Sequence, residues 1–199
     1  MKNRDFIITS LQPWDIEIGS TIKNTALEIS KNNRVLYINT PMDYSTRLRG
    51  NKNKAWTRRM DVIKKQASPI RQINEHMWIA DCPFCVLPVG GLPTTCLFDW
   101  INRINNRKIA DYIRQITTQL NFNNYIHLID TDIYRSQYLK EYLTPSLSIY
   151  YCRDFVIGES YWKKNGVRLE PLLAAKSDIV LANSTHFAER FRQYNRHTF

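Results

Sequence analysis

The chain has 199 residues, a net charge of +10 and a hydrophobic share of 43%. This apolar content is enough for a packed core, which excludes an intrinsically disordered chain, and the length fits one large domain or two small ones. The sequence lacks the roughly 18 unbroken apolar residues of a membrane span, and its start, MKNRDFIITS, does not have a signal peptide's apolar region. We therefore expect a cytosolic protein whose cysteines stay reduced.

Strand and helix patterns alternate along the chain. Six apolar runs have the length of strands, and several are continuous, which favours strands buried on both faces, as in parallel sheets. These runs are 6–9, 35–39, 77–80, 125–129, 147–152 and 179–182. Helical periodicity covers residues 22–29 and 100–120 and resumes after Thr185. The pattern predicts an α/β fold, a Rossmann-like and mainly parallel sheet in a single domain over 1–199.

Two segments do not fit this alternation. Residues 43–73 are basic and are broken by Gly50 and Pro69, and we interpret them as an excursion with a short helix. Residues 83–93 contain three prolines and two glycines, which predicts a loop.

Most of the positive charge lies in the basic excursion. Residues 47–71 contain nine lysines and arginines and the single acidic residue Asp61. Trp56, Met60 and Ile63 share one helical face, and a cationic helix with an apolar edge is typical of membrane surfaces. A solvated basic loop is the alternative. The candidates for a membrane or anion patch are Arg58, Arg59, Lys64 and Lys65.

Polar residues follow each predicted strand, where open parallel sheets bind ligands. They are Ser10, Asn39, Asp81, Asp130, Arg153-Asp154 and Asn183-Ser184.

The loop after the first strand, SLQPWDIEIGS, lies at the same ends of the predicted strands, which we call the rim. Its Gly19-Ser20 pair opens a helix, whose free N–H groups and dipole attract a phosphate, and Gly19 allows close approach of a ligand. Alternatively, Ser20 only caps the helix, and Asp15 and Glu17 lie in a turn. The sequence has no G-x-G-x-x-G motif and thus no dinucleotide signature.

Three blocks resemble a known family. LQPWDIEIGSTIKNTALEISKNNRVLYINTP, IYYCRDF and YWKKNGVRLEPLLAAKSDIVLANS are similar to the amino-terminal half of bacterial GT-B glycosyltransferases, close to glycosyltransferase family 4. The resemblance runs from about Phe6 to Asn195 and weakens across 47–71. It implies an acceptor-binding domain that faces a second, nucleotide-sugar-binding domain. This chain would then be the acceptor domain, inactive by itself, with the carboxy-terminal donor domain absent.

The resemblance also implies roles for several residues. Gly19 and Ser20 match the glycine-rich turn that lies near donor phosphate in the family. Arg153 and Asp154 lie where many relatives have His-Asp. The arginine keeps its charge, so it would stabilise a leaving diphosphate or bind an acidic acceptor. Asp154 would orient a sugar hydroxyl or act as a base, or else be only a structural partner of Arg153.

The remaining candidates complete the rim. Asp15 is a third catalytic candidate, and Trp14, Asn183 and Ser184 are candidates for substrate binding. For Asn183 and Ser184 a strand terminus and a helix cap are the simpler interpretation.

No metal or cofactor is expected. The Cys82–Cys85 pair has redox spacing, but the prolines and glycines that follow cannot begin the helix that activates such a pair. The histidines lack metal-ligand spacing. Asp130 and Asp132 are similar to the D-x-D of other glycosyltransferases, but they are expected to end a strand.

The function that the sequence favours is sugar transfer. The donor would be a nucleotide sugar and the acceptor a glycan or lipid-linked acceptor of cell-surface polysaccharide synthesis. The anionic inner face of a membrane is a candidate partner surface. One alternative is a sugar-nucleotide epimerase domain with the GT-B architecture. The other is a nucleic-acid-binding module that uses the basic excursion, but no recognition motif supports nucleic acid as a partner.

Overall fold

The computed structural model describes residues 1–16, 19–51 and 53–199. Glu17 and Ile18 of the loop after the first strand, and Lys52 of the basic excursion, lie outside this description. The strands are β1 (Asp5–Ser10), β2 (Arg34–Ile38), β3 (Met42–Asp43), β4 (Ile70–Asn74), β5 (Met77–Ala80), β6 (Cys85–Val86), β7 (Ile126–Asp130), β8 (Leu147–Cys152) and β9 (Ile179–Ala182). The helices are α1 (Thr21–Ser30), α2 (Tyr44–Arg49), α3 (Lys54–Ile63), α4 (Thr95–Gln119), α5 (Leu139–Leu143), α6 (Ser160–Lys176) and α7 (Thr185–Arg192), with a 3-10 turn at Val156–Gly158.

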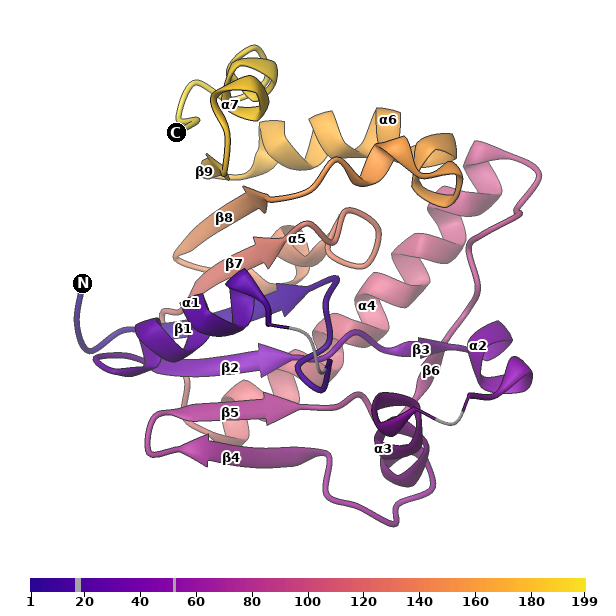
Figure 1. Cartoon of the computed structure of the whole chain (residues 1–199), viewed down its shortest axis with the longest axis vertical. Coiled ribbons are helices and arrows are strands. Elements are labelled where there is room, and N and C mark those ends of the chain that lie inside the picture. Colours follow the sequence, from indigo (N-terminus) through magenta and orange to yellow (C-terminus); the bar gives the residue numbers. More distant parts are fainter. Residues whose placement is uncertain (17–18, 52) are drawn as a thin grey trace.

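Seven of these strands form one mostly parallel sheet in the order β4-β5-β2-β1-β7-β8-β9 (Figure 1). The six strands predicted from the sequence are all present, and within this set of six every neighbouring pair is parallel. Counted along the chain, these six lie in the order third, second, first, fourth, fifth and sixth. This is the order of doubly wound dinucleotide-binding folds, so the predicted α/β, Rossmann-like class is confirmed.

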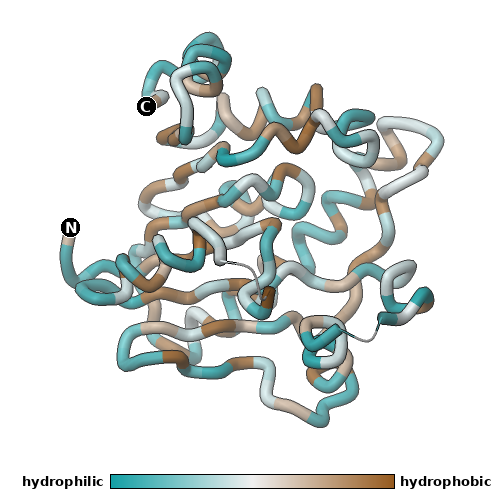
Figure 2. Tube along the Cα trace, in the orientation of Figure 1, coloured by the Kyte–Doolittle hydropathy of each residue, from teal (hydrophilic) through white to brown (hydrophobic). Residues whose placement is uncertain are grey.

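Helices cover both faces of the sheet because successive strand residues point to opposite sides. On β1, Phe6 and Ile8 pack with Ile22 and Ala26 of α1. Ile7, between them, lies in a second cluster with Ile113 of α4. The hydrophobic colouring in Figure 2 accordingly runs along the central strands, while the outer turns are hydrophilic.

The basic excursion is more structured than the sequence predicts. It contains two helices, α2 and α3, rather than one, and its end is the edge strand β4, which pairs antiparallel with β5. The sequence missed β4 because IRQIN is mainly polar and no residue of the strand is fully buried. Within the predicted loop 83–93, β6 pairs with β3 in a two-stranded sheet.

Helix α3 turns its apolar edge into the protein. Met60 forms a small buried cluster with Met42 and Cys85, and Trp56 and Ile63 pack against this cluster. The two-stranded sheet and its neighbours thus cover the apolar edge of α3, which the sequence pattern had suggested as a membrane-binding edge. Among the described residues, none of the helices combines the length and the apolar character needed to cross a bilayer.

Candidate functional site

The polar residues that follow the parallel strands lie along one edge of the sheet. Figure 1 shows the arrowheads of β1, β2, β5, β7 and β8 pointing toward the side where α2 and α3 lie. Side chains at this carboxyl edge form two hydrogen-bonded groups. We call them the Asp130 cluster (Ser10, Gln12, Ser20, Asp130 and Arg153) and the Asp81 cluster (Asp15, Asn39, Arg58, Arg71 and Asp81).

The Asp130 cluster joins the ends of β1, β7 and β8. Asp130 is fully buried, and its Oδ2 accepts a hydrogen bond from Ser10 Oγ at 2.7 Å. Arg153 binds the same carboxylate, with Nε 2.7 Å from Oδ1 and Nη2 3.2 Å from Oδ2. The hydrogen bond to Asp130 raises the pKa of Arg153, although burial acts in the opposite direction. The guanidinium is therefore a fixed and permanent positive charge at the edge.

Gln12 links this charge to the start of α1. Its Oε1 accepts from Arg153 Nη2 at 3.3 Å and from Ser20 Oγ at 2.5 Å. Ser20 occupies the N-cap position, but its side chain makes no capping hydrogen bond, contrary to the simple capping interpretation. Open space surrounds Gly19 where a Cβ would lie, so this glycine is not required by local packing.

The Asp81 cluster joins the ends of β2 and β5. Asp81 is fully buried and accepts from Asn39 Nδ2 at 2.7 Å and from Arg58 Nε at 3.0 Å. Asp15 forms an ion pair with Arg71 at 2.5 Å and accepts from Asn39 Nδ2 at 3.2 Å. The loop between β1 and α1 thus contributes Gln12 to one cluster and Asp15 to the other.

Trp14 belongs to the same loop and is packed on both sides. Its backbone N–H donates to Asn39 Oδ1 at 2.7 Å, and its ring meets the Tyr37 ring edge-on at 5.4 Å between centroids. Lys23 Nζ lies 5.3 Å from the centre of the Trp14 ring. These contacts hold the indole against α1 and β2.

The three candidates that follow β8 and β9 have different surroundings. Asp154 has a side chain 61% exposed, and its Oδ2 lies 3.5 Å from Arg153 Nη1, so it is an accessible carboxylate at this edge. Asn183 Nδ2 donates to the carbonyl oxygen of Arg153 at 2.8 Å. Ser184 caps α7 by accepting from the backbone N–H of Phe187 at 3.3 Å, the helix-capping role expected as the simpler interpretation.

The four residues of the candidate basic patch do not form one surface. Arg58 is directed into the Asp81 cluster, where it also donates to the carbonyl oxygen of Ser68 at 2.5 Å. Arg59 is half-buried, whereas Lys64 and Lys65 are exposed at the end of α3. Because Arg58 is already neutralised by Asp81, the patch has less free charge than the sequence count indicates.

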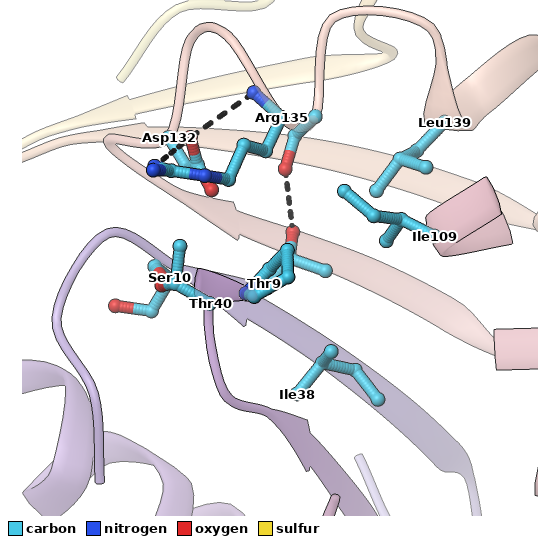
Figure 3. Close-up of a pocket in the computed structure, with 10 residues that line it drawn as sticks. Thr9, Ser10, Ile38, Thr40, Ile109, Asp132, Arg135 and Leu139 are labelled. Carbon is cyan, nitrogen blue, oxygen red and sulfur yellow. Dashed lines mark hydrogen bonds and ion pairs between the residues drawn. The ribbon is translucent and has the colours of Figure 1, made fainter. Parts of the chain in front are cut away.

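Another arginine, Arg135, lines the carboxyl edge close to β1 and β7. Figure 3 shows its side chain beside Asp132 and over the Ser10 and Thr40 side of a small cavity, with Ile109 and Leu139 on the other side. The cavity has a volume of about 10 Å³, and Arg135 also lines another of about 10 Å³ near Tyr161. Burial raises the pKa of Asp132, although the charge of Arg135 lowers it. Asp132 Oδ1 lies 4.0 Å from Arg135 Nη1, so the ion pair between them is long.

The cysteine pair has no features of a redox site. Cys82 and Cys85 are both buried and unpaired, and burial raises the pKa of Cys82 to about 12. A thiol with such a pKa is almost entirely protonated at neutral pH and is a poor nucleophile. Within residues 1–16, 19–51 and 53–199, no group of three or more His, Cys, Asp or Glu residues is placed to hold a metal ion.

Sequence reasoning named the strand ends but missed some of the residues that connect them. Arg71 and Arg135 were not among the site candidates, and Gln12 was noted only as part of the loop. Arg135 follows Asp130 by five residues in DTDIYRS, so its proximity to a strand end was a usable signal. Arg71 had no such signal, because it reaches Asp15 only through the unpredicted strand β4.

Neither the family models nor the curated proteins contain a match to this sequence. The arrangement at the carboxyl edge is therefore the basis for a functional assignment. It provides fixed positive charge, an exposed carboxylate and a helix start, which together suit a ligand with anionic and hydroxyl groups.

Proposed function

We propose that this chain is the acceptor-side domain of a glycosyltransferase with the GT-B architecture. A second, donor-binding domain would complete the enzyme, which transfers a sugar from a nucleotide sugar to a glycan or lipid-linked acceptor in cell-surface polysaccharide synthesis. The observation that carries the proposal is the pair at the end of β8: Arg153 is held in place by Asp130, and Asp154 beside it is exposed.

Arg153 supplies the positive charge for this reaction. Sugar transfer releases a nucleotide diphosphate, and a preorganised cation stabilises the charge that develops on the leaving group. Gln12 accepts hydrogen bonds from both Arg153 and Ser20, so the start of α1 lies close to the guanidinium. The helix dipole favours a phosphate at this helix start. Both features support a diphosphate at the middle of the carboxyl edge.

Asp154 supplies the group that meets the acceptor. Its exposed carboxylate can accept a hydrogen bond from a sugar hydroxyl or take its proton. The two cavities that Arg135 lines at this edge hold only about 10 Å³ each, so the domain that faces this edge provides the rest of the binding site in this proposal.

Sugar transfer by the complete gene product tests the proposal. Labelled nucleotide sugars are incubated with the protein and a membrane or glycan fraction, and label in the acceptor is measured. Asp154→Asn is expected to lower the rate by about 10²-fold or more. Asp111→Asn is the matched control, because Asp111 on α4 is equally exposed, at 61%, and belongs to neither cluster.

Three results would contradict the proposal. One is the absence of transfer with every donor and acceptor tried. Another is equal activity of the Asp154→Asn and Asp111→Asn variants, which would remove Asp154 from the site. The third is conversion of a nucleotide sugar without any acceptor, which would identify an epimerase instead.

A further inference from the structure

Phe155 is an exposed aromatic residue next to the pair that carries the proposed function. It follows Arg153 and Asp154 directly after β8, and it is 55% exposed. Exposure by itself does not mark a binding residue, since Trp100 on α4 is 63% exposed. Two further features distinguish Phe155: its ring is held by several neighbours, and polar groups lie beside it.

Three neighbours hold the Phe155 ring. It stacks with the ring of Phe187 on α7, with 6.3 Å between the centroids and 13° between the planes. The guanidinium carbon of Arg190 lies 5.6 Å from the ring centre, and Arg190 is itself fixed by an ion pair at 2.7 Å with the buried Glu170. A Cβ on Gly158 would lie 3.0 Å from Cδ1 of the ring, so this glycine lets the ring lie close to the 3-10 turn. A ring held in this way loses little freedom when a ligand binds.

Polar groups lie beside the ring because β8 and β9 end next to each other, with their last residues in register. The two segments that follow these strands stay in contact. Asn183 Nδ2 donates to the carbonyl oxygen of Arg153 at 2.8 Å, and two residues further on Phe155 stacks with Phe187. Asp154 lies between these two contacts, with its carboxylate exposed. The ring, the carboxylate and the amide therefore belong to two adjoining segments at the carboxyl edge.

This combination of groups fits a pyranose ring. The C–H groups on one face of a sugar ring pack against an aromatic ring, and the hydroxyl groups at its rim need hydrogen-bond acceptors. The exposed carboxylate of Asp154 is one such acceptor. Asn183 Oδ1 is another, since it accepts no hydrogen bond from the residues that the structure describes. A phosphate, in contrast, would gain nothing from the ring.

We propose that the Phe155 ring is a stacking platform for a pyranose unit of the acceptor, with Asp154 and Asn183 accepting hydrogen bonds from its hydroxyl groups. This inference rests on the proposed function, in that the ligand of this edge is taken to be a sugar acceptor. It adds the part of the acceptor that is recognised. That part is a sugar ring with an unbroken face of C–H groups, as in gluco- and galacto-configured pyranoses, rather than a lipid or a phosphate.

Saturation-transfer NMR on the 199-residue chain tests the platform. Protein protons are saturated in the presence of the methyl glycosides of glucose, galactose, mannose and N-acetylglucosamine, with sorbitol as an open-chain blank. At least one glycoside should receive saturation at its ring C–H protons, whereas sorbitol, which has hydroxyl groups but no ring face, should receive none. Phe155→Ala is expected to weaken the binding of that glycoside about tenfold.

Trp100→Ala is the matched control. It removes a similarly exposed aromatic side chain from α4 and should leave glycoside binding unchanged. Saturation of none of the glycosides, or equal affinity in Phe155→Ala and wild type, would overturn the inference.

Two conservative variants separate stacking from a structural role. Phe155→Tyr keeps a flat ring and should bind the glycoside within about twofold of the wild type. Phe155→Leu keeps an apolar side chain without a ring and should lose binding as Phe155→Ala does. Both should unfold within about 2 °C of the wild type, because the side chain is exposed. Equal loss of binding in Phe155→Tyr and Phe155→Leu would contradict a stacking role.

A protein surface is the alternative cover for the ring. If another part of the complete protein packs on Phe155, then Phe155→Leu should lower the Tm of the complete protein but not that of the 199-residue chain. That result, together with no saturation of any glycoside, would replace the sugar with a protein contact and overturn the inference.

Failure of this inference can be distinguished from failure of the proposed function. In the complete protein, Phe155→Ala should raise the acceptor KM about tenfold and leave kcat within about twofold. Sugar transfer with an unchanged acceptor KM in Phe155→Ala would overturn the platform and leave the transferase intact. Phe155-dependent binding of a glycoside without any sugar transfer would support the platform and overturn the transferase.

Discussion

Asp130 and Asp154 show how two carboxylates near one arginine can have different roles. Asp130 is fully buried and binds both Ser10 and Arg153, so it holds the arginine in place. Asp154 touches the same guanidinium from solvent, at 3.5 Å. Breaking a buried ion pair leaves a charge without a partner, whereas exposed pairs contribute little to stability.

This difference predicts opposite outcomes for two similar substitutions. Asp130→Asn should lower the free energy of unfolding by about 3 kcal/mol, because Arg153 would lose its buried counterion. Asp154→Asn should change it by less than about 0.5 kcal/mol. Urea denaturation of both variants measures the two values. A stability loss in Asp154→Asn as large as that in Asp130→Asn would mean that Asp154 is structural.

At the scale of elements, α6 shows how closely a helix can approach the site. Gly166 lies on its buried face, where a Cβ would be 2.8 Å from Ile133 Cδ1 and 2.9 Å from Ile157 Cγ2. Ile133 belongs to the segment between Asp132 and Arg135. The absence of a side chain at Gly166 therefore allows α6 to pack directly against the segment that positions Arg135.

Gly166→Ala is expected to destabilise the protein. Alanine favours a helix over glycine by about 1 kcal/mol, but overpacking in a close-packed interior typically costs about 1–3 kcal/mol. Since both contacts are shorter than 3.0 Å, we expect a net loss of about 1 kcal/mol in the free energy of unfolding. Gly19→Ala is the control, because Gly19 has open space around it and should tolerate alanine. Increased stability of Gly166→Ala would show that the two isoleucines move easily.

At the scale of the whole molecule, a buried histidine links stability to pH. His127 lies on the central strand β7, fully buried, with Nε2 2.9 Å from Thr9 Oγ1. Burial lowers its pKa from 6.5 to about 3. Below pH 6.5 the unfolded chain binds a proton that the folded chain does not, so stability is complete above this pH and is lost as the pH falls toward 3.

Between pH 7 and pH 5 this effect amounts to about 2 kcal/mol. His127→Gln should lose that much less stability than the wild type over the same interval, as measured by urea denaturation at each pH. His186→Gln, at an exposed position of α7, should behave as the wild type does. The buried Asp132 changes stability in the opposite direction, but it is present in all three proteins and cancels in the comparison. Equal slopes for wild type and His127→Gln would contradict the effect.

The amino-acid sequence by itself determined the six parallel strands, the helices α1, α4 and α7 and the polar residues at the strand ends, but its periodicity did not predict α6. These features depend on local patterns, since apolar runs and helical periodicity are properties of neighbouring residues. Only the tertiary structure decided which polar residues meet. Arg71 reaches Asp15 through the edge strand β4, and Arg153 donates to Gln12, which lies 141 positions away along the chain. Such contacts arise from strand order and helix packing. They join residues far apart in the sequence, and no local sequence pattern predicts that these residues meet.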